Sequence, residues 1–340
     1  MEFFDLLVIY FYSYVPAILL ALFFWWMDRF ERESFILVCA AFFWGAFGAG
    51  LLSYFWNSFF HIALDVYQKG NASTNDVIVS VIVAPFVEEL TKGIVILLLL
   101  WLNKIDNVTD GILMGVVIGL GFAAAENVHY AQNVIYPNSG ELAMWHNLWF
   151  REIHTTLLHA SASAVWGAMI GYSRLLNYTE RFFSWMIGFV LAMVTHGFWN
   201  FLASYVGRIR APFNLVQILM RLELMLIFGS LITLYLVSLR RQSRVIIKEL
   251  LEEHEAGLVP FEHIGFFASL VRHPKRYQLP AGISVTEYAH LGVRLAFRKN
   301  QDRFHSSAIL RAEIERLRAQ LKDVLMPPKS ETQEDENEQP

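Results

Sequence analysis

The stretch Pro85-Phe86-Val87-Glu88-Glu89-Leu90-Thr91-Lys92 lies in the middle of an apolar run from Val77 to Leu102. That run is long enough to cross a bilayer, which takes roughly 20 apolar residues. Each charge at the centre of a membrane helix costs about 2.5–3.5 kcal/mol on insertion scales. Folding alone does not require that cost, so we interpret these charges as groups that serve chemistry or transport.

Helical spacing brings the three charges together. Glu88 and Lys92 are four residues apart and share a helix face, while Glu89 and Lys92, three apart, are also neighbours. Two adjacent carboxylates in a low dielectric cannot both ionise cheaply, and an ammonium beside them helps one to stay charged. This is one way to build a general base in an apolar place. Pro85 cannot donate to the carbonyl of Val81, so we expect a kink or a loosened turn there.

Composition predicts a polytopic membrane protein and not a soluble enzyme. Of the 340 residues 55% are hydrophobic, with 28 Phe, 13 Tyr and 10 Trp, and the mean hydropathy is +0.40. The single cysteine, Cys39, rules out a disulfide within the chain and a Cys-based metal site. The first residues lack a basic n-region, so we expect a retained helix in place of a signal peptide. We expect lipid and protein partners and no nucleic acid.

Apolar segments define the expected all-α fold of about seven transmembrane helices. They lie at about residues 6–27, 35–60, 77–102, 111–134, 151–173, 183–206 and 215–239. We therefore expect residues 1–239 to form a transmembrane domain, followed by a cytoplasmic helical extension at 240–326 and a disordered acidic tail at 327–340. In the extension, the helices are expected at Arg240–Leu258, Val285–Phe297 and Ser306–Leu325.

The orientation follows from the basic residues near the segment ends. The last segment is followed by Arg240, Arg241, Arg244 and Lys248. This cluster places the C-terminus in the cytoplasm, and a chain of seven spans then has its N-terminus outside.

Three later segments also place polar residues at helical spacing. The fourth has a close-packing stripe of small residues and then two polar ones: Gly111, Gly115, Gly119, Ala123, Glu126 and Asn127. The fifth has a four-residue repeat: Arg151, Thr155, His159 and Ser163. The sixth has His196 and Asn200. On the helical rise, Glu126, His159, His196, Asn200 and Glu88–Glu89 lie roughly 9–18 Å from the outer end, which predicts one shared layer.

These motifs are familiar as a set. Glu88-Glu89-x-x-Lys92, Glu126-Asn127, His159 and His196-x-x-x-Asn200 resemble, in this order, the PrsW family of glutamic intramembrane proteases. The related CAAX-processing and bacteriocin-processing protease superfamily has a similar first motif that usually ends in arginine. The resemblance covers about residues 1–210.

The resemblance implies a polytopic protease of the plasma (bacterial inner) membrane that cuts a membrane-anchored protein. In PrsW-type systems the implied substrate is an anti-sigma factor, cut on its extracytoplasmic side. The C-terminal extension lies outside the resemblance, which leaves its regulation or its choice of a cytoplasmic partner open.

Amide hydrolysis requires a water, a base for that water and donors for the developing oxyanion. We expect Glu88 to be the general base and Glu89 to share or tune its proton, or the reverse, because coupled sites titrate as a pair. His196 and Asn200 would hold the carbonyl oxygen. His159 would position the water or protonate the leaving amine.

Supporting roles are expected for Lys92, Glu126 and Asn127. Lys92 would keep one glutamate charged, and the other two would orient the catalytic groups from the neighbouring helix. Interhelical hydrogen bonding is the alternative interpretation for Glu126 and Asn127. Arg151 and Arg221 are interpreted as interface or snorkelling residues.

Three other functions compete with a metal-free protease. Two histidines and a glutamate could hold zinc in a metalloprotease, but the His-Glu-x-x-His signature is absent, so no cofactor is expected and zinc ranks lower. The buried acids and histidines could instead form the relay of a proton-coupled transporter or channel, although the chain has no internal repeat. A third alternative is a membrane scaffold whose cytoplasmic helices recruit a partner.

Overall fold

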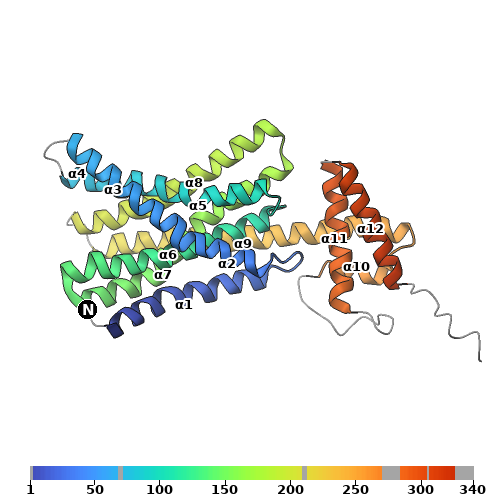
Figure 1. The fold of residues 1–340 in the computed structure, drawn as a ribbon, viewed down its shortest axis with the longest axis horizontal. Coiled ribbons are helices and arrows are strands. Elements are labelled where there is room, and N and C mark those ends of the chain that lie inside the picture. The colour runs from blue at the N-terminus through green and yellow to red at the C-terminus, as the bar shows by residue number, and fades with distance from the viewer. Residues whose placement is uncertain (1–2, 68–71, 209–212, 270–283, 305, 326–340) are drawn as a thin grey trace, which may run out of the picture. The chain divides into compact units, whose positions relative to one another are not determined.

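The computed structural model describes residues 3–67, 72–208, 213–269, 284–304 and 306–325, and these form only helices and the turns that join them (Figure 1). The all-α fold class is therefore confirmed. The predicted tail at 327–340 lies outside the described residues. The chain divides into two compact units, unit 1 with Met1–Asp28 and Arg32–Leu236, and unit 2 with Arg29–Glu31 and Val237–Pro340.

Every apolar segment predicted from the sequence is helical. In chain order the elements are α1 (Phe3–Met27), α2 (Phe35–Phe43), η1 (Trp44–Ala49), α3 (Gly50–Tyr67), α4 (Ala72–Ile78), η2 (Val79–Val83), α5 (Ala84–Trp101), α6 (Val108–His129), η3 (Tyr130–Ile135), α7 (Tyr136–Tyr172), η4 (Ser173–Leu175), α8 (Tyr178–Arg208) and α9 (Phe213–Glu255). The elements η1, η2 and η3 are π-helices, and η4 is a short 3-10 helix.

Five helical stretches are long and apolar enough to cross a membrane: Phe3–Met27, Phe35–Tyr67, Val108–Leu175, Tyr178–Ser204 and Leu215–Glu255. The third of these holds two spans, because Gly140 (φ +79°) interrupts the helix between α6 and the main part of α7. The helical run from α4 to α5 is missing from this set because its middle contains Glu88, Glu89 and Lys92. The chain is thus a polytopic membrane protein.

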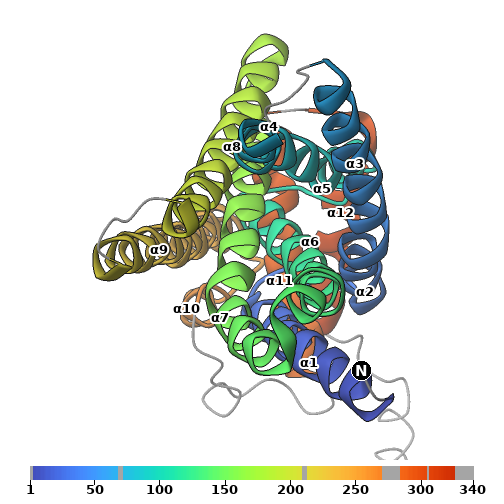
Figure 2. The same ribbon diagram turned by 90° about the vertical axis from the view of Figure 1, so that its left-hand side faces the viewer.

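Helix α6 forms the centre of unit 1. Nearly all its side chains between Thr109 and Ala124 are buried, as expected for a helix that is apolar on every face. It packs against α1, α2, α5 and α7. Figure 2, which looks along the bundle, shows α6 enclosed by these neighbours. The elements that supply the polar residues therefore pack around one shared axis.

The small-residue stripe of α6 is in contact with the backbone of α7. A Cβ atom added to Gly115 would overlap the carbonyl oxygen of Ser163, and one added to Gly119 would overlap that of His159. Such close approach of two helices is what small residues at four-residue spacing permit. The predicted packing stripe is confirmed, and it fixes the height at which α7 presents His159 and Ser163.

Unit 2 contains the end of α9 with α10 (Phe261–Phe267), α11 (Val285–Phe304) and α12 (Ala308–Leu325). The three helices predicted in the extension are confirmed, and the short α10 is additional. Lys299 is buried, and its Nζ atom lies 2.6 Å from Glu253 Oε1 and 3.1 Å from Glu252 Oε2. Arg303 pairs with Glu249 (2.7 Å) in the same network. Charges as well as apolar contacts therefore hold α11 against α9.

The α6–α7 contact gives a prediction for stability. Gly115→Ala should lower the melting temperature of the detergent-purified protein, because overpacking a tight contact costs about 1–3 kcal/mol. Gly229→Ala on α9 is the matched control, since no atom lies within 4 Å of its added Cβ. Equal melting temperatures for the two variants would contradict the packing described.

Candidate active site

The site is organised around the buried side chain of Lys92. This ammonium lies near the middle of the apolar helix α5 and has no exposed surface. Its Nζ atom is 2.8 Å from Glu89 Oε1 and 2.9 Å from His159 Nδ1, and it lies 3.9 Å from the centre of the Phe122 ring. A carboxylate, an imidazole lone pair and an aromatic face together compensate for its lost hydration.

The contacts of His159 determine its tautomer. An ammonium can only donate, so Nδ1 accepts from Lys92 and has no proton. The Nε2 atom lies 2.8 Å from Glu126 Oε2 and therefore donates to that carboxylate. Both nitrogens of a neutral His159 are thus engaged, and Glu126 and Lys92 hold the ring in place from two other helices.

Glu89 is fully buried and fully hydrogen-bonded. Its Oε1 atom accepts from Lys92 and from His196 Nδ1 (3.0 Å), and its Oε2 atom accepts from Ser163 Oγ (3.0 Å). Three donors stabilise the ionised form of this carboxylate. Both oxygens of Glu89 are therefore engaged by protein donors.

Glu88, the neighbouring residue, is in a different situation. Asn57 Nδ2 of α3 donates to its Oε1 atom at 3.2 Å. Its Oε2 atom is buried, makes no hydrogen bond in the described part of the chain, and lies 3.7 Å from His196 Nε2. Glu88 Oε2 and His196 Nε2 therefore lie near each other, just beyond hydrogen-bond distance.

The charges that contact one another directly do not balance. Three carboxylates, those of Glu88, Glu89 and Glu126, stand against the two cations Lys92 and Arg151. One further proton makes the buried cluster neutral, which its low dielectric favours. Glu89 and Glu126 each accept from a cation. Glu88, by contrast, makes no ion pair with either cation in the described part of the chain.

A second polar layer surrounds Glu126. Arg151 contacts Glu126 Oε2 (2.6 Å), and its Nε atom donates to Asn127 Oδ1 (2.9 Å). Asn127 donates in turn to Glu152 (2.8 Å) and to Thr156 Oγ1 (3.2 Å). Asn127 therefore acts on the cluster through Arg151. Arg151 of α7 thus joins the network to α6, and its interpretation as an interface or snorkelling residue stays a prediction.

Asn200 is bonded to the backbone instead of to the acidic pair. In the π-helix η2, the N–H of Ala84 donates to the carbonyl of Val79, five residues back. The corresponding bond to the carbonyl of Ser80 would need an N–H from Pro85, which has none. Asn200 Nδ2 supplies it at 2.8 Å. The loosened turn expected beside Pro85 is confirmed, and Asn200 ties α8 to it.

The same residues offer one possible metal site. Ligand atoms of Glu88, His159 and His196 lie within 4.8 Å of one another, and all three side chains are buried. Glu89 behind His196 and Glu126 behind His159 are carboxylates of the kind that orient metal-bound histidines. Both nitrogens of His159 are engaged, so it would have to release Lys92 or Glu126 before it bound a cation.

Comparison with known proteins gives one result that fits this geometry. The profile of the PrsW family, described as intramembrane metalloproteases, matches residues 33–232. The chain belongs to the PrsW family. It is therefore a membrane protease, and the matched range contains every residue of the cluster. A search of curated proteins and a search of solved structures each returned no match.

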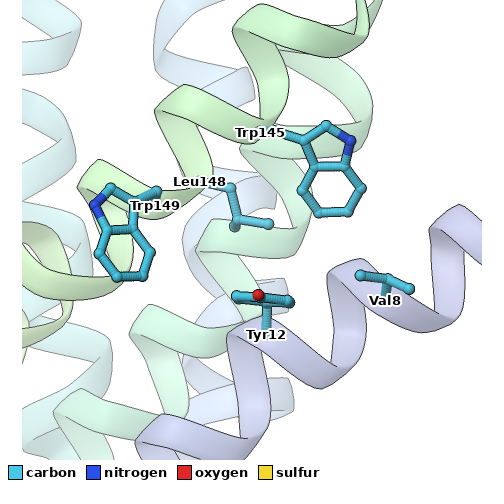
Figure 3. A pocket seen from close by; sticks show the side chains of 5 residues that line it. All are labelled: Val8, Tyr12, Trp145, Leu148 and Trp149. Carbon is cyan, nitrogen blue, oxygen red and sulfur yellow. The ribbon is translucent and has the colours of Figure 1, made fainter.

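This PrsW protein also has a separate pocket of about 380 Å³ between α1 and α7 (Figure 3). It is lined by Val8, Tyr12, Trp145, Leu148 and Trp149. None of these residues contributes to the buried cluster, and the lining is apolar and aromatic. The chemistry of this PrsW protein therefore has to be sought in the cluster and not in the pocket.

Two contacts of the cluster were not assigned from the sequence. The sequence places Ser163 on a polar stripe without assigning it a role, and Asn57 lies outside the motifs. The polar spacing around Asn57 is a sequence signal for this contact, because Ser53, Asn57 and His61 recur every four residues at the end of the second apolar segment and just beyond it. His159, His196, Glu126 and Lys92 do converge with Glu88 and Glu89.

Lys92→Met tests the role of the ammonium. The change leaves Glu89 and Glu126 with one cation instead of two, and breaking a buried pair typically costs about 3–5 kcal/mol. We expect a clear loss of thermal stability in detergent and a loss of cleavage. Lys104→Met, at an exposed loop lysine, is the matched control. A Lys92→Met protein as stable as this control would contradict the account.

Proposed function

We propose that the protein is an endopeptidase that hydrolyses a peptide bond of a membrane-anchored protein with a water activated by Glu88. The observation that supports this most is the contrast between the two adjacent acids. Each oxygen of Glu89 accepts a hydrogen bond from the protein, whereas Glu88 keeps one oxygen without a hydrogen bond beside His196. Glu88 is therefore the base, and Glu89 holds His196 through Nδ1.

In this mechanism Glu88 takes a proton as the water oxygen bonds to the scissile carbonyl carbon. His196, in its protonated form, donates from Nε2 to the developing oxyanion. The C–N bond then breaks, and the leaving nitrogen receives the proton from Glu88. The products are a carboxylate and an amine, and the cluster regains its starting charge after one proton returns to solvent.

The remaining cluster residues position these two. His159 links Glu126 to Lys92 through its two ring nitrogens and so helps to hold both in position. Ser163 donates to the second oxygen of Glu89. Asn200 acts on α5 through the carbonyl of Ser80, so its amide serves the acidic pair through the backbone. An oxyanion role for Asn200 would require that it leave this bond.

The substrate is inferred from family membership. PrsW-type systems favour a single-span substrate such as an anti-sigma factor, and the predicted orientation places the cut on the extracytoplasmic side of a bacterial inner membrane. The helices of unit 2 offer a place for a cytoplasmic partner.

The test is co-expression with a panel of single-span reporters that have a different tag on each side of the membrane. Glu88→Gln should reduce fragment formation by about 10²–10⁴-fold, the usual contribution of a general base. Glu89→Gln should also abolish cleavage but lower stability as well, since it loses a buried charge partner. Glu141→Gln, at an exposed acid, is the control. Full activity of Glu88→Gln would overturn the proposal.

Zinc-dependent hydrolysis is a second candidate, because the family description names metalloproteases and the donors of Glu88, His159 and His196 suit zinc. Bound zinc would supply Lewis-acid polarisation and a more acidic water. His196 and Glu88 each have an atom available for such an ion, whereas His159 must first release Lys92 or Glu126.

Metal analysis of the purified protein separates the two candidates. For the metal-free mechanism we expect well below about 0.1 zinc per chain and cleavage that persists in the presence of phenanthroline. About one zinc per chain, lost in His196→Ala and accompanied by inhibition with the chelator, would favour the metalloprotease.

A further inference from the structure

The contact between Asn57 and Glu88 leaves two buried acceptors without hydrogen bonds. Asn57 Nδ2 donates to Glu88 Oε1, whereas Asn57 Oδ1 and Glu88 Oε2 have no hydrogen-bond partner among the described residues. Leaving a buried acceptor unsatisfied costs about 1–3 kcal/mol. A single water has two protons and can donate to both oxygens, which is the usual role of buried water in proteins.

Asn57 belongs to a polar edge of α3, which we define as Ser53, Asn57, His61 and Asp65. These residues are spaced four apart and lie on one face of the helix. Ser53, at the deep end, is buried, and its Oγ atom lies 2.8 Å from Thr91 Oγ1 of α5. The opposite face is apolar and exposed, with Phe55, Trp56, Phe59 and Phe60. The polar edge thus faces α5 while the aromatic face is available to lipid.

The other end of the polar edge reaches partly exposed charged groups. His61 Nε2 lies 3.0 Å from Asp76 Oδ1 of α4, and its Nδ1 atom lies 3.1 Å from Asp65 Oδ2. Asn75 Nδ2 donates to Asp65 Oδ1 at 2.8 Å. The side chains of His61 and Asp76 are 39% and 50% exposed. One turn of helix, about 6 Å, separates His61 from Asn57.

We propose that the polar edge of α3 is the path by which water reaches Glu88, and that Asn57 holds the attacking water against Glu88 Oε2. This inference rests on the proposed function of Glu88 as the base. The opposite side of the acidic pair is closed, because Glu89, Lys92 and His159 have no exposed surface. Glu88 retains 6% exposure and faces α3 through Asn57, so water arrives from that side.

Thiol labelling tests the path without any substrate. The sole cysteine, Cys39, is replaced by Ser, and Asn57→Cys and Phe55→Cys are compared in lipid nanodiscs with a charged methanethiosulfonate. Phe55 is 60% exposed in the protein, so lipid alone should protect it. We expect Asn57→Cys to react at least about tenfold faster, because the reagent needs water and a thiolate. Equal or slower labelling at position 57 would overturn the path, whatever the outcome for Glu88→Gln.

Reporter cleavage tests the second half of the proposal. Asn57→Leu keeps the size of the side chain but removes the acceptor, so kcat should fall at least about 30-fold with KM changed less than about threefold. Asn57→Ser, which leaves room for a second water, should retain more activity than Asn57→Leu. Phe59→Leu, on the lipid face, is the control. A wild-type rate in Asn57→Leu would overturn the role of Asn57. If the leucine variant does not accumulate, a wild-type rate in Asn57→Ser would overturn it, and a reduced rate would support it.

Discussion

An ammonium with no access to solvent dictates the arrangement of unit 1. Lys92 can remain charged in the interior only if other groups replace its hydration shell, and α5 alone can supply only Glu89. His159 of α7 and Phe122 of α6 complete the shell. Those two helices must therefore approach α5 at one height, and they bring Glu126 and Ser163 with them. The polar layer is a consequence of satisfying one cation.

The same constraint separates two adjacent acids that are chemically identical in sequence. Glu89 points toward Lys92 and accepts hydrogen bonds from three donors. Glu88, about 100° around the helix, points toward α3 and accepts one, from Asn57. His196 lies between them with one nitrogen on each. This asymmetry suits a general-base site, in which Glu89 holds His196 and Glu88 has an oxygen available for the water. The relay of a transporter would need no such asymmetry.

Much of this could be predicted from the sequence because membrane insertion makes charges expensive. The costly residues Glu88, Glu89, Lys92, Glu126, His159 and His196 stand out in apolar segments, and spacing places them on helix faces. Spacing cannot say which partner a face meets. The roles of Asn57 and Arg151 depend on the rotation of α3 and α7 about their axes, and tertiary packing sets that rotation. The contact of Asn200 is unpredictable for a related reason, since the free carbonyl of Ser80 exists only once η2 forms.

The contact of Gly115 and Gly119 with α7 has a mechanical consequence. Where two backbones touch directly, there are no long side chains that could change rotamer and let the helices separate gradually. The contact between α6 and α7 is therefore a rigid wall behind Glu88 and Glu89. A substrate peptide that is unwound for cleavage would then enter on the opposite side, where α3 contacts α5 through a few polar groups. The peptide and the water would use the same entrance to Glu88.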